Sequence, residues 1–334
     1  MAVLSGTMTF AEAAKRTDPT QRAAQIVEIL DQTNEITSDA PVKEGNLEIG
    51  HQIATRLSIP APTWIGPNTG IASTTSTVGQ DIEPIGMLSN KSLVDIHVAN
   101  FGGNLQANLL SESRAILEGM AQEMAATLIY GNQGTAVYEF DGLAPRFNSL
   151  SGTTGENIIN GGGSDSDNTS IWLVGWGDRK VNLIYPKGSK AGLEQMNRGI
   201  VDVAVAAGAG SASTTYPAYM TYFYWKTGLC VEDWRYISRG CNIDVSSLRA
   251  KSSAADLYDM MIRMTHRIPN LKACMPRFYA NRTVIEQLDI QTRDDVQTGG
   301  QLKYADVAGE RVLSFRGIPI RTVDQITLAE ATIS

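Results

Sequence analysis

Two pairs of neighbouring carboxylates are the residues of this sequence best suited to acid/base chemistry. One pair is Glu232-Asp233, and the other is Asp294-Asp295 beside Arg293. Two carboxyl groups can act as general acid and general base when their surroundings give them different pKa values. Neighbouring side chains on a strand or helix point in different directions, so each pair needs partners from elsewhere in the fold. We interpret both pairs as surface charge and keep a cytosolic hydrolase that uses Glu232 and Asp233 as an alternative.

Histidines and cysteines, the usual triad members and metal ligands, are few and scattered. The six residues are His51, His97, His266, Cys230, Cys241 and Cys274. The histidines lie in unrelated sequence contexts, so their spacing predicts no catalytic triad. The cysteines are odd in number and form no C-x-x-C pair, which argues against a disulfide framework and a zinc motif. We therefore predict buried thiols and no metal ion or other cofactor.

The short motifs of the common enzyme classes are missing from the sequence. It contains no Walker phosphate loop, dinucleotide fingerprint, nucleophile elbow or zinc-protease motif. The stretch 165–168, DSDN, resembles the start of a calcium loop but lacks the glycine and the distal glutamate. The aromatic residues of 216–234 have few basic residues among them, so they favour sheet packing over base stacking. We predict no catalytic residue and a protein that is not an enzyme.

Charge and hydropathy exclude further classes of protein. The 334 residues carry a formal net charge of −7, which gives no basic surface for gripping phosphate backbones. The sequence has neither an apolar run near 18 residues nor a secretory leader, so we expect no membrane contact and synthesis in the cytosol. The length favours two domains, or one domain with large excursions.

A long amphipathic helix is predicted over 104–130. Its apolar residues recur at steps of three, four and seven, which places them on one stripe. This predicted packing face consists of Leu105, Leu109, Ile116, Met120, Met124 and Leu128. Asn104 is expected to cap the first turn, and Gly131 to close the last turn in the left-handed conformation.

The residues before this helix read as extensions from a compact body. Two short amphipathic pieces within 8–35, the second over 21–32, must rest on this chain's own body or on a neighbouring copy, and both possibilities stay open. Residues 44–100 read as a long β-arm with an outgoing strand in 47–59 and a returning strand over 92–99. Three apolar residues near its centre, Trp64, Ile65 and Ile71, predict contact with a partner because a solvated loop is normally polar.

The second half of the chain reads as α+β. Strands are predicted over 171–175 and 180–185, then over 219–230 and 231–239, and again over 272–280. A helix capped by Ser252 or Ser253 runs to His266, a second helix covers 282–290, and 312–326 returns as strands with a turn at Arg316-Gly317.

Three segments of these elements are informative as a set: MAQEMAATLIYGN at 120–132, YEFDGLAPRF at 138–147 and FRGIPIRTVDQI at 315–326. With these segments, the elements taken in order resemble the major capsid proteins of tailed double-stranded DNA phages, which have the Hong Kong 97-like fold, and most closely those of short-tailed phages. The order and spacing of the segments cover most of the chain.

The resemblance implies a division into an N-terminal arm, an extended loop and two domains. The arm is 1–43, and the extended β-loop that lies over a neighbouring subunit is 44–100. The peripheral domain comprises 101–150 and 216–269, with the spine helix at 104–130. The axial domain comprises 151–215 and 270–334.

The resemblance also implies partners and a place. Copies of the chain form hexamers and pentamers of an icosahedral shell around packaged double-stranded DNA, which is not bound specifically. Scaffold, portal and decoration proteins are expected as separate chains, and assembly is expected in the host bacterial cytoplasm. Some members join subunits covalently through a lysine of the loop, but Lys91, the only lysine between Glu44 and the helix, lies on the returning strand, so we predict no such link. An encapsulin-type compartment with the same fold is the alternative.

Overall fold

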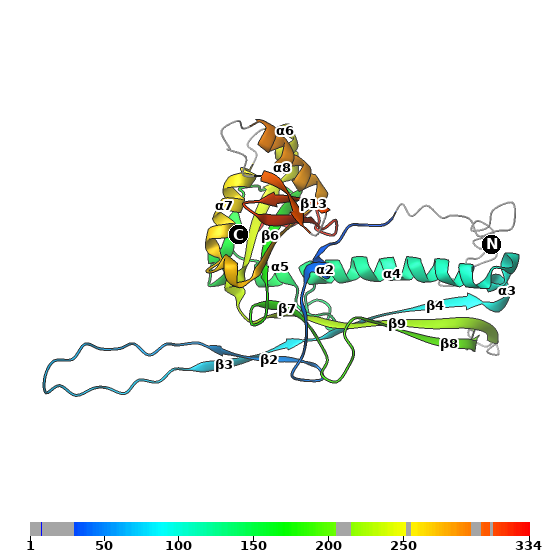
Figure 1. The fold of residues 1–334 in the computed structure, drawn as a ribbon, viewed down its shortest axis with the longest axis horizontal. Helices are drawn as coiled ribbons and strands as arrows, with labels where there is room; N and C mark the ends of the chain where they lie inside the picture. The colour runs from blue at the N-terminus through cyan, green and yellow to red at the C-terminus, as the bar shows by residue number, and fades with distance from the viewer. Residues whose placement is uncertain (1–7, 9–29, 205–214, 252–254, 295–301, 308–309) are drawn as a thin grey trace.

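The computed structural model describes residues 8, 30–204, 215–251, 255–294, 302–307 and 310–334. It shows a compact body of mixed helix and sheet, a long limb that leaves the body in one direction, and a hairpin that leaves it in the opposite direction (Figure 1). The predicted α+β class is confirmed. No helix among the described residues is long and apolar enough to cross a membrane.

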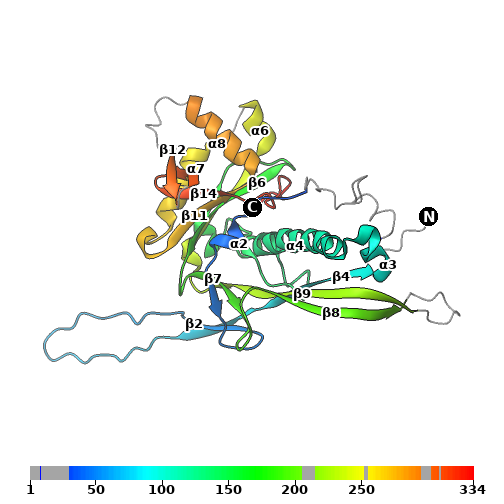
Figure 2. The ribbon, with the colours of Figure 1, turned by 45° about the vertical axis from the view of Figure 1, so that its right-hand side comes forward.

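The limb is a three-stranded antiparallel sheet with one long helix along it. Strand β9 (Thr215–Val231) lies between β4 (Gly86–Asp95) and β8 (Leu193–Ala204), and its ladder with β4 runs from Gly86 opposite Thr227 to Asp95 opposite Ala218. Helix α4 (Leu105–Tyr130) runs along this sheet, and its C-terminal end reaches the compact body (Figure 2). The helix is about 39 Å long at 1.5 Å per residue.

The two ends of α4 differ from the sequence expectation. Asn104 is the N-cap residue, but its side chain makes no capping hydrogen bond. Gly131 has φ −48° and ψ 134°, so it is not left-handed. Glycine is needed there for another reason: a Cβ would lie 2.5 Å from the carbonyl oxygen of Thr127 and 2.6 Å from that of Phe140. The chain folds back onto the helix end too closely for a side chain.

The compact body is organised around β6 (Asn168–Trp176), every residue of which is buried. It pairs antiparallel with β10 (Ile237–Asp244) and β11 (Met275–Ala280). Strand β11 runs parallel to β14 (Ile318–Thr322), which continues antiparallel into β13 (Glu310–Phe315) and β12 (Leu302–Val307). The remaining strands and helices of the body are β5 (Ile158–Asn160), β7 (Val181–Tyr185), α5 (Leu143–Arg146), α6 (Val245–Ala250), α7 (Leu257–Arg267) and α8 (Arg282–Asp294).

The body contains two apolar cores, one on each side of this sheet. One core joins the end of α4 to residues of β6 and β7, such as Trp172 and Val181. The other joins α7 and α8 to the opposite face, through residues such as Met264 and Phe278. Strand β9 packs with α4, and α7 packs with β10 and the C-terminal strands. The grouping of 216–269 with the spine helix, like the other domain boundaries, stays a prediction.

Helix α7 begins later than expected. Its N-cap is Asp256, whose side chain accepts a hydrogen bond from the amide of Asp259. The predicted caps, Ser252 and Ser253, lie outside the described residues. The predicted turn at Arg316-Gly317 is confirmed, since both residues have positive φ, 52° and 82°, and join β13 to β14 as a two-residue hairpin.

The extended β-loop is a hairpin separate from the main sheet. Strands β2 (Gly50–Arg56) and β3 (Val78–Pro84) pair only with each other among the described residues. The returning strand predicted at 92–99 is wrong in its bounds: β4 already begins at Gly86 and ends at Asp95. There the Asp95 carboxylate accepts from the amides of His97 and Val98, which turns the chain into helix α3 (Ile96–Ala99).

The N-terminal arm is described only at residue 8 and from residue 30 onward. It contains helix α2 (Ile36–Asp39) and strand β1 (Val42–Glu44), which runs parallel to β7. Met8 is buried beside Val94 and Val98 near the far end of the limb. Most of the helix predicted over 21–32 lies outside the described residues.

Candidate functional site

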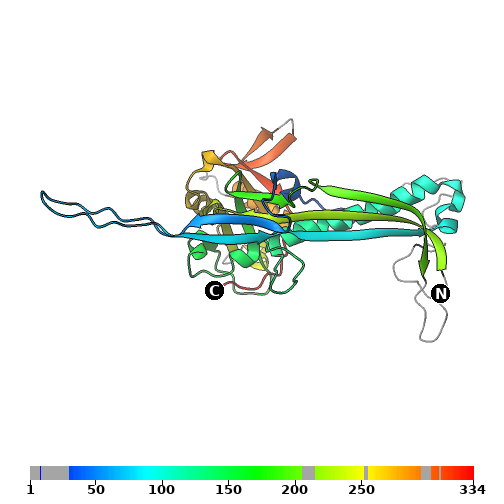
Figure 3. The ribbon, with the colours of Figure 1, turned by 90° about the horizontal axis from the view of Figure 1, so that it is seen from below.

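The tip of the extended hairpin is the most exposed apolar segment among the described residues. Residues 57–77 contain neither helix nor strand, and they project beyond the body in line with the limb (Figure 3). Trp64 is 104% exposed, and the two other residues singled out from the sequence, Ile65 and Ile71, are also exposed. Leu57 and Ile59 add to this surface. A single chain therefore leaves a cluster of large apolar side chains in water.

The root of the hairpin is fixed to the body by a buried ion pair. Nη1 and Nη2 of Arg146 donate to the two carboxylate oxygens of Glu83 at 2.6 and 2.5 Å. The same guanidinium donates to the backbone carbonyl of Asp141. Glu83 belongs to β3 and is 5% exposed, while Arg146 ends α5. This bidentate contact holds the hairpin in one direction relative to the body.

The described part of the arm is held between α4 and the C-terminal segment. On the helix side, Glu118 accepts from the amide of Gln32 at 3.1 Å, and Gln122 donates to the carbonyl of Leu30 at 2.8 Å. On the other side, Asp324 accepts from the amide of Thr33 at 3.0 Å. Residues 30–33 therefore contact their own chain. Whether the arm also contacts a neighbouring copy depends on the residues before 30.

The predicted packing face of α4 is divided between two clusters. Met120, Met124 and Leu128 are buried, and the last two belong to the core of the body. Leu105 and Leu109 are half-buried against Val94 and Val98 of β4 and α3. Ile116, between the two clusters, is half-buried. Ser113, which interrupts the apolar stripe, donates its hydroxyl to the carbonyl of Leu109 at 2.8 Å, so its polarity is satisfied within the helix.

A buried polar network joins the end of α4 to β10 and the C-terminal segment. Arg239 donates to Glu330 at 2.8 Å, to the hydroxyl of Ser170 at 3.0 Å and to the carbonyl of Phe147 at 2.7 Å. Tyr130, the last residue of α4, donates to the other oxygen of Glu330 at 2.5 Å. Burial and the neighbouring carboxylate raise the pKa of Tyr130 well above its ordinary value, so the hydroxyl keeps its proton.

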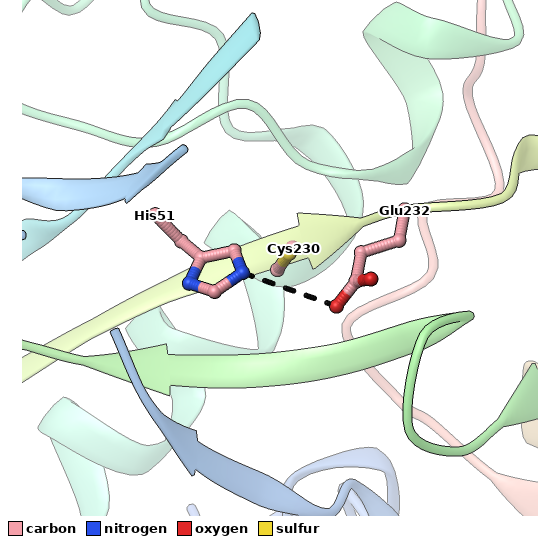
Figure 4. Close-up of side chains that lie close together, drawn as sticks. All are labelled: His51, Cys230 and Glu232. Atoms are coloured by element: carbon pink, nitrogen blue, oxygen red, sulfur yellow. Dashed lines mark ion pairs between the residues drawn. The ribbon is translucent and has the colours of Figure 1, made fainter. Parts of the chain in front are cut away.

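Three potential metal ligands meet where the hairpin root, β7 and β9 come together (Figure 4). The ligand atoms of His51, Cys230 and Glu232 lie within 4.8 Å of one another, and Nε2 of His51 is 4.0 Å from Glu232. Nδ1 of His51 accepts from the amide of Asn46 at 3.2 Å, which places the proton of the neutral ring on Nε2.

This arrangement fits an electrostatic contact better than a metal centre. Burial raises the pKa of the Cys230 thiol to about 12, so the thiolate form that binds metals is disfavoured. Glu232 is also 3.7 Å from the ammonium group of Lys43 on β1. The cluster joins the arm, the hairpin and β9 at one point. A metal ion could bind Nε2 of His51 only if the proton on that nitrogen left.

The carboxylate pair of the hydrolase alternative does not converge. Glu232 faces Lys43 and His51, whereas Asp233 accepts from Nε and Nη2 of Arg235 at 2.9 and 2.8 Å. Burial alone would raise the pKa of Asp233, but the hydrogen bonds from Arg235 outweigh it and hold the pKa below its ordinary value. In the second pair, Asp295 lies outside the described residues.

The acidic loop at 165–168 stabilises the N-terminus of helix α6 by hydrogen bonds. Asp167 accepts from the amide of Ser246, and Asp244 accepts from the amide and hydroxyl of Ser247 at the start of α6. These bonds, led by the Ser247 hydroxyl, lower the pKa of Asp244 to about 2. Asp165 lies beside both carboxylates, and the local chemistry is that of helix capping.

Sequence reasoning missed the two buried charge pairs, Glu83–Arg146 and Glu330–Arg239. Their members are 63 and 91 residues apart, so no local spacing relates them. The only available signal was a charged residue in an apolar setting, such as Arg239 within a predicted strand.

Comparison with known proteins identifies similar chains. A family model described as "Major capsid protein GP7" matches residues 18–334. A chain from the structure of bacteriophage Epsilon15 is 33% identical over 100% of this chain and 99% of its own length, with a TM-score of 0.77. None of the curated proteins matches this chain.

Two further solved structures show weaker similarity. A chain of the bacteriophage JBD30 capsid is 9% identical, over 90% of this chain and 99% of its own length, with a TM-score of 0.43. An encapsulin from Synechococcus elongatus is 8% identical, over 72% of this chain and 96% of its own length, with a TM-score of 0.42.

Proposed function

Because this chain belongs to the family of major capsid protein GP7, we propose that its hairpin tip and N-terminal arm are the parts that join one copy to the next. Members of this family build the icosahedral shell of a bacteriophage from many copies of one subunit, and that is the function of this chain. The family resemblance stated from the sequence is confirmed, and the match favours the phage shell over the encapsulin alternative.

The observation that carries the proposal is the exposure of the tip. Trp64, Ile71, Leu57 and Ile59 are each more than 70% exposed on a two-stranded hairpin, and an isolated hairpin of this kind is at best marginally stable in water. Burying these side chains against neighbouring copies removes apolar surface from water and stabilises both the tip and the shell. The buried Glu83–Arg146 pair supports the proposal, since it aims the tip away from its own body.

The proposed mechanism of the shell is geometric and involves no catalysis. The candidate carboxylates Glu232 and Asp233 engage different basic partners, which supports this view. The net charge of −7 supports a shell that encloses double-stranded DNA without gripping its phosphates. Assembly into hexamers and pentamers in the host cytoplasm, with separate scaffold, portal and decoration proteins, stays a prediction from the family.

The test is removal of the tip with the root left intact. Residues 60–75 are replaced by two glycines, which keeps the hydrogen bonds that close the hairpin between Ser58 and Thr77. We expect the variant to unfold at the same temperature as the parent but to form no shells in negative-stain images and sedimentation.

A matched control keeps the tip and changes one of its polar residues. Thr74→Ala alters the same segment at an exposed position without touching an apolar side chain and should assemble normally. Normal shells from the tip deletion would contradict the proposal.

A further inference from the structure

An apolar cavity opens on the limb, close to where it meets the hairpin root. It has a volume of about 140 Å³. It lies between the start of β4, the C-terminal half of α4 and the segment before α5. Its lining residues are Gly86, Met87, Leu88, Glu123, Met124, Thr127, Tyr138, Glu139 and Phe140. Two of them are large apolar residues left in water: Tyr138 is 91% exposed and Met87 is 59% exposed.

The cavity has the size and chemistry of a site for one aromatic ring with a hydrogen-bond donor. An engineered apolar cavity of about 150 Å³ binds benzene, so about 140 Å³ accommodates a ring of that kind. Glu123 and Glu139 are among the lining residues, and their carboxylates are hydrogen-bond acceptors. Among side chains, the indole of tryptophan combines an apolar ring with a single N–H donor that needs a partner when buried.

One tryptophan is available for such a site. All five lie in the described part of the chain: Trp172 and Trp176 are buried, Trp225 and Trp234 are half-buried, and only Trp64 is exposed. Trp64 follows His51 at the root by 13 residues, which places it roughly 40 Å away along an extended chain. The tip points away from the limb (Figure 1). Trp64 therefore cannot reach the cavity of its own chain. Only Trp64 of a second copy can place an indole ring there.

We propose that Trp64 of one copy inserts its indole into the cavity between Met87, Met124 and Phe140 of a neighbouring copy, with its N–H donated to Glu123 or Glu139. This inference rests on the proposed role of the tip in joining subunits and names the surface that receives it. Most of the affinity of a protein interface comes from a few aromatic anchors in such pockets. The contact repeats around the shell because every copy carries both the tip and the cavity.

The test is a disulfide that can form only between two copies. Trp64→Cys and Tyr138→Cys are made in separate subunits, which are assembled together with an excess of wild-type subunits and oxidised. We expect a covalent dimer on a non-reducing gel, at least tenfold stronger than in two matched mixtures. One mixture replaces Tyr138→Cys by Leu117→Cys, an exposed position on α4 that is not among the lining residues of the cavity. The other contains wild-type subunits alone, which carry two buried thiols and one half-buried thiol.

A second measurement tests the chemistry of the anchor. The subunit concentration needed for assembly should rise at least tenfold in Trp64→Ala and by less in Trp64→Phe, which keeps a ring but loses the N–H. Shells whose Trp64→Cys and Tyr138→Cys subunits form no more dimer than the Leu117→Cys mixture would overturn the inference. That result would not contradict the proposed role of the tip in joining subunits. Only normal assembly of the tip-deletion variant would contradict that role.

Discussion

At the scale of single residues, buried charges connect parts of the chain that are far apart in sequence. Glu83 and Arg146 fix the hairpin, and Glu330 and Arg239 fix the C-terminal segment. A buried ion pair is not in itself a strong source of stability, because both charges lose their hydration. Its effect is on direction: the bidentate geometry favours one orientation of the hairpin, and we propose that the tip depends on that orientation to reach another copy.

Removal of one partner of the Glu83–Arg146 pair should be strongly destabilising. Arg146→Ala leaves the Glu83 carboxylate buried without its cation, and we expect a loss of about 3–5 kcal/mol in the free energy of unfolding by denaturant. The double variant Arg146→Met with Glu83→Met removes both charges and should recover most of that loss.

An exposed ion pair on α7 provides the control for this prediction. Arg263 and Asp259 are 2.7 Å apart with side chains 63% and 47% exposed, so Arg263→Ala should cost less than about 1 kcal/mol. Equal losses for Arg146→Ala and Arg263→Ala would refute the anchoring role of the buried pair.

At the scale of elements, α4 is in contact along its whole length. Its first turns pack on β4 and α3, its last turns belong to the core of the body, and its polar side binds the arm through Glu118 and Gln122. Ile116 is on the predicted packing face but is only half-buried, because it lies between the cluster at the start of the helix and the core at its end.

A helix-breaking substitution at the middle of α4 should disconnect the contacts of its first turns from those of its last turns. Ala115→Pro removes a backbone hydrogen bond and introduces a clash with the preceding turn, at a cost of about 3 kcal/mol or more. We expect a lower melting temperature and no shells. Ala115→Ser, at the same exposed position, should cost no more than about 0.7 kcal/mol and assemble normally. Assembly of the proline variant at normal yield would contradict the structural role of an unbroken helix.

At the scale of the whole molecule, the subunit has the extended shape of a component of a larger assembly. The limb and the hairpin leave the body in opposite directions (Figure 1), and both carry exposed apolar residues. We therefore propose that sites for contact with other copies lie at both ends of the chain's longest dimension. Such a subunit gains stability from its neighbours, and that gain depends on subunit concentration.

The shell should be held together without covalent links between subunits. Lys91 lies on β4 opposite Tyr222 in the ladder with β9, and the tip itself contains no lysine. When purified particles are boiled in detergent and reducing agent, this subunit should run as one band at 36.1 kDa. A ladder of multimers that persists after reduction would show that a covalent link forms.

The sequence alone determined the features that depend on local periodicity and turn chemistry. The bounds of α4 were predicted within one residue, because its apolar spacing is sustained over seven turns. The turn at Arg316-Gly317 and helix α8 were predicted for the same kind of reason. The exposed tip residues Trp64, Ile65 and Ile71 could be singled out because apolar side chains in a turn-rich segment conflict with solvation.

The tertiary structure decided everything that depends on residues far apart in the chain. Gly131 was expected to be left-handed, but its role is set by the close approach of Phe140. The apolar face of helix α7 packs on the side of β6 opposite to the end of α4. The pairing of Arg146 with Glu83 requires two distant segments to meet, and the cavity beneath Tyr138 requires three. Local spacing carries no information about such meetings, because side chains 60 to 90 residues apart are brought together only by packing of the whole chain.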